Sequence, residues 1–318
     1  MLLAGASVVV LAVCLVGLAV DGRALVGAPI WLKPAKFAVS IAIYCFTLAW
    51  LLSLLQRRRR LGRALGSIIA ITLGGELVVI VVQVVRGEMS HFNISTPLNA
   101  VLWASMGVMI ATLWVANLVA GALFLTQKLG ERSTAWAIRA GTVIALAGMA
   151  VAFFMPQETA AQDAAREAGR GSGIVGAHTV GVPDGGPGLP ITGWSTVAGD
   201  LRVPHFVGIH GLQVLILLAL VLLLLARRYP RFASDTLRLR VVLVAAGAYA
   251  GVLALVTWQA FRGQSVVRPD ALTASVAAAL AVAAVVGLLL ALRTPREPTL
   301  RQPEGATATV TEDREGVA

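Results

Sequence analysis

Eight apolar runs constrain this chain more than any other feature. They cover residues 2–20, 36–55, 64–85, 98–126, 135–155, 205–226, 237–260 and 271–292. A helix rises about 1.5 Å per residue, so each run can cross a hydrocarbon core roughly 30 Å thick. Only 13% of the residues are charged, about half the share in a typical soluble domain. The sequence therefore predicts an all-α integral membrane protein, with eight transmembrane helices in a single domain over residues 1–292.

The positions of Lys and Arg predict how these helices are oriented. Basic residues are concentrated at 57–63, 128–139 and 227–240 and in the tail 293–318. Because positively charged short loops stay in the cytoplasm, we expect both termini there, with the lipid bilayer around the helices. The tail has no apolar period and is expected to be disordered. The net charge of +10 follows from this topology, so no nucleic-acid partner is expected.

The composition indicates the source and the compartment. The chain is rich in Ala, Val, Leu, Gly and Arg and has just three Lys, which is typical of a GC-rich bacterial genome. A multi-pass protein of this kind is expected in the bacterial cytoplasmic (inner) membrane. Cys14 and Cys45 both fall inside apolar runs, so a disulfide framework is not expected.

The loops on the opposite face contain the unusual residues. All four histidines, His91, His178, His205 and His210, fall in or beside these loops. The longest loop, 156–204, contains a polar segment at 157–170 that reads as a surface helix or a spacer. After it come closely spaced Gly and Pro residues, which favour tight turns. Long loops are commonly functional or disordered, and we expect this one to be an ordered lid over the helix ends.

The two halves of the chain echo each other. The third apolar run ends in QVVRG, beginning at Gln83, and the seventh ends in QAFRG, beginning at Gln259. Each is followed by a proline near the start of the next run. An even number of spans gives both halves the same orientation, so the echo predicts a parallel internal repeat of two four-helix halves, 1–130 and 131–292.

Polar residues in and beside the spans suggest a site for an anion. Glu76 and Gln83 lie within about 20° of each other around a helix, and the stripe continues to Arg86. A carboxyl group at mid-membrane is costly, so Glu76 is expected to face the bundle. There it is a proton acceptor, a cavity wall, or a protonated group bonded to a neighbouring helix. Arg86 and Arg262 are predicted at the same depth, at the outer ends of their helices. There they could bind a phosphate, a carboxylate or haem propionates, or reach lipid phosphates. The candidate set is completed by Lys36, Glu88, Asp184, Asp200 and Gln259.

The histidines suggest a second kind of site. His205 and His210 are five residues apart, or about 140° around a helix, so they do not share a face for one metal ion. The spacing predicts His205 at the membrane rim and His210 pointing into the bundle, with His91 or His178 as its nearest partner. Neutral imidazole ligates haem b and transition metals. Each histidine taken alone also fits a plain interfacial role.

Three stretches of the chain resemble an uncharacterised bacterial family of polytopic membrane proteins. They read GAPIWLKPAKFAVS, RGEMSHFN and GAHTVGVPDGGPGLPITGWSTVAGDLRVPHFVGIHGLQ. This resemblance covers nearly the whole chain and implies no activity. The eight-span layout with histidines on one face also resembles the architecture of haem A synthase, a family with a histidine pair in each half. Here the fourth and eighth runs lack histidine, and Lys36 stands where His205 would be echoed. The resemblance therefore implies at most one haem site.

Three functions remain as expectations. The first is a haem- or metal-binding protein with a redox or electron-transfer role and a membrane redox partner. The second is a transporter or sensor for an anionic or lipid-like solute, built on Arg86, Arg262 and Glu76. The third is a structural subunit of a membrane complex, including a homo-oligomer. The chain has no Walker, C-x-x-C-H or H-E-x-x-H motif, so the sequence leaves open whether it is an enzyme.

Overall fold

The structure, a computed structural model, describes residues 1–293, and the rest of the predicted tail lies outside the described residues. Eight of its helices are long and apolar enough to cross a membrane. They are α1 (Leu2–Val20), α2 (Leu32–Ser53), α3 (Arg59–Arg86), α4 (Pro97–Thr126), α5 (Arg132–Val151), α7 (Arg202–Arg228), α8 (Asp235–Phe261) and α9 (Ala271–Leu292). The expected all-α, multi-pass architecture is confirmed.

The remaining elements are short and lie in the connections. They are β1 (Ala24–Leu25), β2 (Ala28–Pro29), η1 (Ala152–Phe154), α6 (Ala160–Glu167), β3 (Thr179–Val180), β4 (Gly199–Asp200) and η2 (Pro230–Ala233). β1 pairs with β2, and β3 pairs with β4, both antiparallel. The helix α6 lies within the polar segment 157–170 and begins with a capping box made by Thr159 and Gln162.

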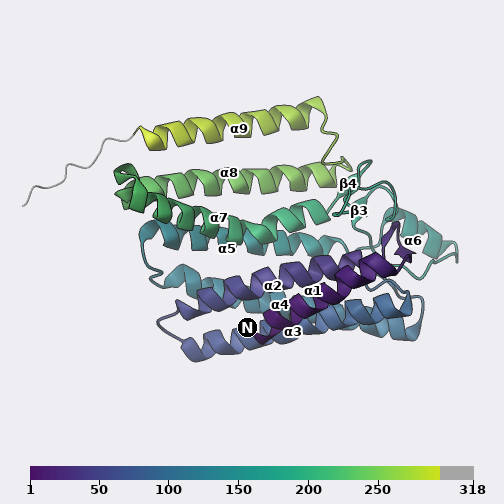
Figure 1. The fold of residues 1–318 in the computed structure, drawn as a ribbon. Coiled ribbons are helices and arrows are strands. Elements are labelled where there is room, and N and C mark those ends of the chain that lie inside the picture. The colour runs from purple at the N-terminus through teal and green to yellow at the C-terminus, as the bar shows by residue number, and fades with distance from the viewer. Residues whose placement is uncertain (294–318) are drawn as a thin grey trace, which may run out of the picture.

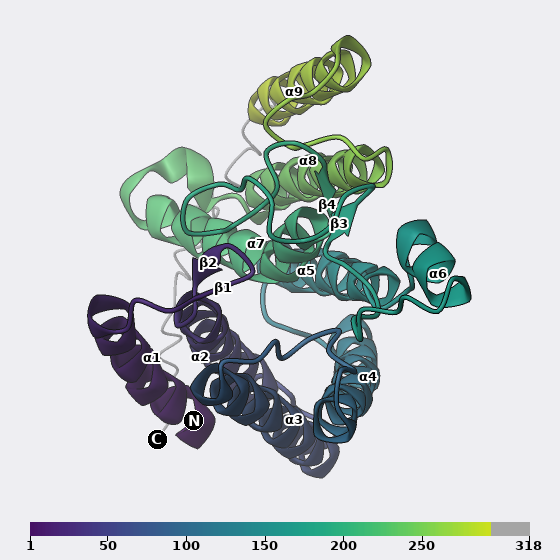
Figure 2. The same ribbon diagram turned by 90° about the vertical axis from the view of Figure 1, so that its right-hand side faces the viewer.

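The long helices form two groups (Figure 1). The first group holds α1 to α4 and the second holds α5, α7, α8 and α9 (Figure 2). α2 packs on α1 and α3, α7 packs on α5 and α8, and α4 joins the groups through α5. The change of group falls between α4 and α5, where the predicted halves 1–130 and 131–292 meet. That the halves are copies of one unit stays a prediction.

α3 and α8 end in the same local geometry. Gly87 and Gly263 close the two helices with φ of 74° and 71°, a conformation that glycine adopts without strain. The side-chain amides of Gln83 and Gln259 each donate to the carbonyl oxygen six residues later, at 3.0 Å and 2.8 Å. The sequence echo therefore corresponds to two equivalent helix ends.

α2 and α7 are among the helices that begin earlier than the apolar runs predict. α2 begins at Leu32 and α7 at Arg202, because Pro34 and Pro204 fall in the first helical turns, where proline is well tolerated. Lys36 and His205, the first residues of the predicted runs, therefore lie inside their helices. Lys33, which lies before the predicted start of the second span, also belongs to a helix. The predicted lid loop also loses its last three residues, 202–204, to α7.

α5 and α7 approach each other very closely. A Cβ atom added to Gly148 would lie 2.4 Å from the Cα of Gly208, and one added to Gly141 would lie 2.7 Å from the Cα of Leu212. Real Cβ atoms do not come this close, so the two helices pack backbone against backbone at these glycines. The first turns of α7 are thereby held against α5.

Loop 155–201, which we call the lid, folds over the helix ends at one end of the bundle (Figure 2). The backbone amide of Ile94 donates to Gly173 at 2.7 Å, and that of Val175 donates to Phe92 at 2.9 Å, so the lid is bonded to the α3–α4 loop. It also contacts the β1–β2 turn, where Gly185 lies against Gly27. The covered end is called the lid end below.

Candidate functional site

The lid covers polar side chains that come from both groups of helices. We call them the lid cluster: Lys33, Lys36, His91, His178, Asp184, Arg202 and His205. They are joined by hydrogen bonds and by charge interactions that run from Lys33 to Arg202 and from His178 to His205. Five of them, Lys36, His91, His178, Asp184 and His205, were expected to be near a site, in different combinations. Their common location under the lid is a result of the tertiary structure.

Lys33 and His91 form the link between α2 and the α3–α4 loop. The Lys33 ammonium nitrogen lies 3.1 Å from Nδ1 of His91, and the Ser90 hydroxyl lies 3.1 Å from the same nitrogen. An ammonium group has only donors, so Nδ1 accepts and the imidazole proton sits on Nε2. Burial and the adjacent Lys33 charge hold the pKa of His91 well below its ordinary value. His91 is therefore a neutral imidazole, with its ring 5.5 Å from that of Trp103.

His178 and Asp184 form a bonded pair inside the lid. Nδ1 of His178 lies 2.5 Å from Asp184 Oδ2, and the carboxylate also accepts the backbone amides of His178 and Thr179 and the Thr179 hydroxyl. Burial opposes ionisation of Asp184, but these donors outweigh it and hold its pKa below the usual range. Burial lowers the pKa of His178 more than Asp184 raises it. The pair is a carboxylate that orients a neutral imidazole.

The tip of the lid, residues 192–194, touches both groups of helices. Lys36 of α2 donates to the Thr192 carbonyl oxygen at 2.9 Å, and Arg202 of α7 donates to the Gly193 carbonyl oxygen at 2.7 Å. The Trp194 ring lies 5.6 Å from the Phe206 ring of α7. The lid tip therefore bridges α2 and α7 at the lid end.

The cations of the lid cluster are only partly neutralised. Arg202 is paired with Asp200 at 2.6 Å, and the Asp200 carboxylate also accepts the backbone amide of Ser195 at 2.8 Å. Among residues 1–293, neither Lys33 nor Lys36 has a carboxylate within ion-pair distance, and Arg202 repels both electrostatically. Two lysines thus share one site with no direct acidic partner in the described part of the chain.

Glu76 of α3 is a second buried carboxyl group within electrostatic range of this cluster, besides Asp200. Its side chain is 1% exposed, and neither of its oxygens has a hydrogen-bond partner among the described residues. Lys33 is a cation that acts on it. The structure therefore places Glu76 inside the bundle, as expected, but shows no bond to a neighbouring helix.

The structure turns His205 into the helix bundle, where it contacts α5, although His205 was predicted at the membrane rim. Nδ1 of His205 lies 2.9 Å from the carbonyl oxygen of Gly148 on α5, and His178 is within its electrostatic range. His210 packs edge-on against Phe206, with ring centroids 4.4 Å apart. The reason is the tight contact of α7 with α5 at Gly148 and Gly208, which turns His205 toward α5.

The histidines fit a two-ligand site better than a larger one. Within residues 1–293, no three His, Cys, Asp or Glu side chains lie close enough together to hold a metal ion. Nδ1 of His178 and Nδ1 of His205 both face oxygen acceptors, so each ring keeps the lone pair of Nε2 available. A carboxylate or carbonyl on Nδ1 is the usual partner of a metal-binding histidine.

The prediction of a shared anion site at Arg86 and Arg262 is wrong. Arg86 donates to Asn99 at 2.9 Å, which ties α3 to α4. Arg262 pairs with Asp270 at 2.6 Å and stacks over the Trp258 ring at 4.5 Å. The two arginines lie on α3 and α8, on opposite sides of the bundle (Figure 2). Each guanidinium holds its own helix end, because the next helix supplies a local acceptor.

Three further candidates belong to the same helix-end turns. Glu88 accepts the side-chain amide of Asn93 at 3.0 Å, and Gln83 and Gln259 bond to the turns that follow their helices. These side chains stabilise the turns and do not enter the lid cluster.

Two residues of the lid cluster, Lys33 and Arg202, were not predicted from the sequence. The available signal was that two of the three lysines stand in WLKPAKF.

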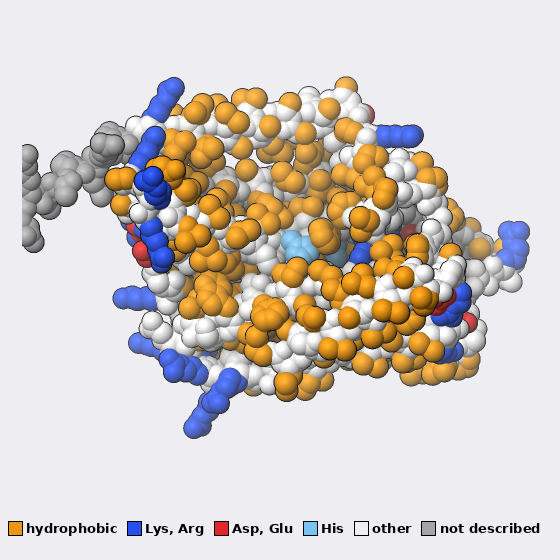
Figure 3. Space-filling model, viewed as in Figure 1, with side chains coloured by type: hydrophobic (Ala, Val, Ile, Leu, Met, Phe, Trp, Pro, Cys, Tyr) orange, Lys and Arg blue, Asp and Glu red, His pale blue; other side chains and the backbone are white. Residues whose placement is uncertain are grey.

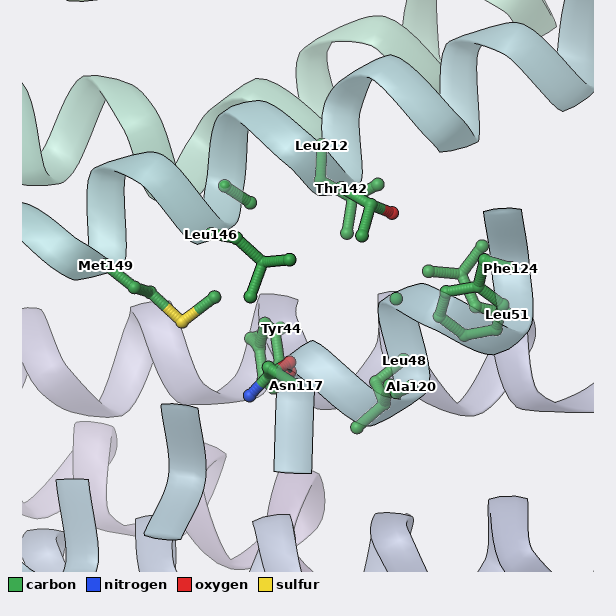
Figure 4. A pocket seen from close by; sticks show the side chains of 12 residues that line it. Tyr44, Leu48, Leu51, Asn117, Ala120, Phe124, Thr142, Leu146, Met149 and Leu212 are labelled. Carbon is green, nitrogen blue, oxygen red and sulfur yellow. Dashed lines mark hydrogen bonds between the residues drawn. The ribbon is translucent and has the colours of Figure 1, made fainter. Parts of the chain in front are cut away.

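A small cavity lies deeper in the bundle, among α2, α4, α5 and α7 (Figure 4). Its volume is about 20 Å³, room for roughly one water molecule. Tyr44, Asn117 and Thr142 provide its polar groups, and the Tyr44 hydroxyl donates to the Asn117 side chain. The cavity is far too small for haem.

The face of the molecule in Figure 3 is hollowed between α2 and α7. A histidine side chain and a Lys or Arg side chain are visible inside this lateral hollow, while the surrounding face is mostly apolar. The two helices that border the hollow are held in place by other helices: α2 packs on α1 and α3, and α7 packs on α5 and α8. The hollow opens on the apolar flank of the bundle.

Comparison of the chain with protein-family models, with curated proteins and with solved structures finds no match.

Proposed function

We propose that this protein binds an anionic group in the lid cluster, as a membrane transporter or sensor for an anionic solute. The proposal rests on one observation: Lys33 and Lys36 share a covered site, and no carboxylate of the described residues pairs with either. Like charges held together in a partly dehydrated site repel strongly. An incoming phosphate or carboxylate relieves this repulsion and accepts hydrogen bonds from both ammonium groups.

The proposed location is the outer face of a bacterial cytoplasmic membrane. The basic loops at 57–63, 128–139 and 227–240 all lie opposite the lid end, and such loops favour the cytoplasm. The lid cluster then faces the periplasm or the cell exterior. An anion would reach it from that side or from the outer leaflet.

The test uses the full-length protein purified in detergent, with inorganic phosphate as the probe at constant ionic strength. Phosphate is expected to raise the unfolding midpoint of the wild type, because it binds the folded site. The double variant Lys33→Gln/Lys36→Gln should lose this shift. The third lysine of the chain, Lys128, is exposed at the opposite end, so Lys128→Gln is the matched control and should keep it. Equal shifts in all three proteins would refute the anion site.

A second candidate function is a haem or transition-metal site with an electron-transfer role. The observation that favours it is the pair His178 and His205, whose Nδ1 atoms face Asp184 and Gly148 respectively. Two neutral imidazoles would supply the axial ligands of haem b or two ligands of a metal ion. His210, which packs on Phe206, would not be a ligand.

Spectroscopy and elemental analysis test this second candidate. The reduced-minus-oxidised spectrum of the purified protein should contain a Soret band, or a metal should be present in stoichiometric amount. His178→Ala and His205→Ala should remove it, while His210→Ala should retain it. A protein without the band and without the metal would rule out this function.

A further inference from the structure

We infer that the anion is the headgroup of an anionic phospholipid that enters the lid cluster sideways, through the lateral hollow between α2 and α7. This inference rests on the proposed anion site and names the class and the route of its ligand. Three features of the structure support it: the closed lid tip, the two helix faces that continue away from it, and the positive charge of Lys33 and Lys36 under the lid.

The lid tip covers the approach from water. Lys36 bonds to Thr192 at 2.9 Å from one side, and Arg202 bonds to Gly193 at 2.7 Å from the other. The Trp194 ring adds an apolar contact to Phe206. These contacts tie residues 192–194 to both helices that border the hollow. The flank between the helices, in contrast, is hollowed on the apolar side of the bundle (Figure 3).

Two helix faces begin at residues that contact the lid tip and continue away from it. On α7, the residues Phe206, His210, Gln213 and Leu217 follow one another at helical spacing, so they share a face. Phe206 is 44% exposed and Leu217 is 62% exposed. Below Phe206, this face is polar at His210 and Gln213 and apolar at Leu217.

The side of α2 that begins at Lys36 also changes from polar to apolar with distance from the lid. Lys36, Ser40 and Ile43 share a face at helical spacing. Lys36 touches the lid tip, and Ile43, about two turns further from the lid, is 44% exposed. A cation at the top and apolar side chains below match a ligand with an anionic head and a hydrocarbon chain.

This pattern selects a lipid over a soluble anion. A soluble anion needs the ammonium groups of Lys33 and Lys36 but makes no use of the apolar faces below them. A phospholipid uses both, because its phosphate reaches the lysines while an acyl chain lies along Leu217 and Ile43. Its path along the bilayer also avoids the covered lid tip.

The experiment compares two probes on the full-length protein in detergent: phosphatidylglycerol and inorganic phosphate. Phosphatidylcholine is the reference lipid, because its zwitterionic headgroup has no net charge. The wild type should bind phosphatidylglycerol more tightly than phosphatidylcholine. Leu217→Trp fills the hollow and should weaken phosphatidylglycerol binding by about tenfold, the loss expected when an acyl chain fails to bury a few methylene groups. The same variant should leave phosphate binding unchanged.

Val282→Trp is the matched control, since Val282 is 63% exposed near the middle of α9. It should bind both probes as the wild type does. If phosphate binding depends on Lys33 and Lys36 but phosphatidylglycerol binds no better than phosphatidylcholine, or is unaffected by Leu217→Trp, the lipid inference is wrong and the anion site stands. If neither probe depends on the two lysines, the proposed anion site itself is wrong.

Discussion

The ammonium nitrogen of Lys33 lies 3.1 Å from Nδ1 of His91. This contact joins the first turn of α2 to the α3–α4 loop, and it places a cation beside an imidazole that burial keeps neutral. Lys33 also acts electrostatically on Glu76 in mid-bundle.

The stability of the protein should fall as the pH is lowered from 7 to 5. The pKa values of His91 and His178 are both lowered in the folded state from an ordinary value of 6.5. Below pH 6.5 the unfolded chain therefore binds protons that the folded protein does not, and unfolding is favoured. Above pH 6.5 this contribution to stability is fully present. Asp184, whose pKa is also lowered, adds a loss only at more acidic pH.

Thermal unfolding in detergent between pH 5 and pH 8 measures this effect. His91→Gln removes one of the two titrating groups and should flatten the pH dependence of the unfolding midpoint. A variant with the same slope as the wild type would show that the acid sensitivity arises elsewhere in the chain.

Glu76→Met should raise the unfolding midpoint. Glu76 is 1% exposed and has no hydrogen-bond partner among the described residues, so an apolar side chain of similar size relieves a desolvation cost of about 1–3 kcal/mol. Gln83 is the matched control, since it is also 1% exposed on α3 but bonds to Met89 and Asn99. Gln83→Met should lower the midpoint. A loss of stability in Glu76→Met would mean that the carboxyl group is satisfied by its interaction with Lys33.

Asp184→Asn should loosen the lid without unfolding the helices. The Asp184 carboxylate holds three donors of the segment 178–179 in addition to the His178 ring, and charge-assisted bonds of this kind are worth roughly 1.5–3 kcal/mol each. Hydrogen exchange in the lid should become about tenfold faster or more, because local opening costs less. Asp163→Asn, which alters an exposed pair with Arg166 in α6, should leave exchange in the rest of the lid unchanged. Equal protection of the lid in both variants would argue against the His178–Asp184 pair as its anchor.

Labelling with a membrane-impermeant maleimide should place the lid outside the cell. The native thiols, Cys14 and Cys45, are buried, so the wild type gives a low background. Val197→Cys lies in the lid at a side chain that is 50% exposed and should react in intact bacteria. Arg57→Cys, in the exposed α2–α3 loop, should react only after permeabilisation. The reverse pattern would invert the proposed orientation.

The sequence by itself determined the spans and the helix ends. The length of an apolar run is a local property, and it sets where a helix can cross a membrane whatever its neighbours are. The turns after Gln83 and Gln259 are local as well, since a glycine with positive φ and a side-chain bond to the following turn need only a short stretch of chain. Both features could therefore be read from the chain, as could the gathering of the histidines at one end.

Only the tertiary structure decided which polar residues meet. Arg86 and Arg262 look equivalent in the sequence but lie on opposite sides of the bundle, because the two helix groups pack side by side. Each residue of a helix turns its face by about 100°, so the glycine contact with α5 decides which face of α7 meets α5 and brings His205 against Gly148. Lys33 meets His91 across more than fifty residues of chain, and such long-range proximity is set by helix packing, which no local pattern encodes.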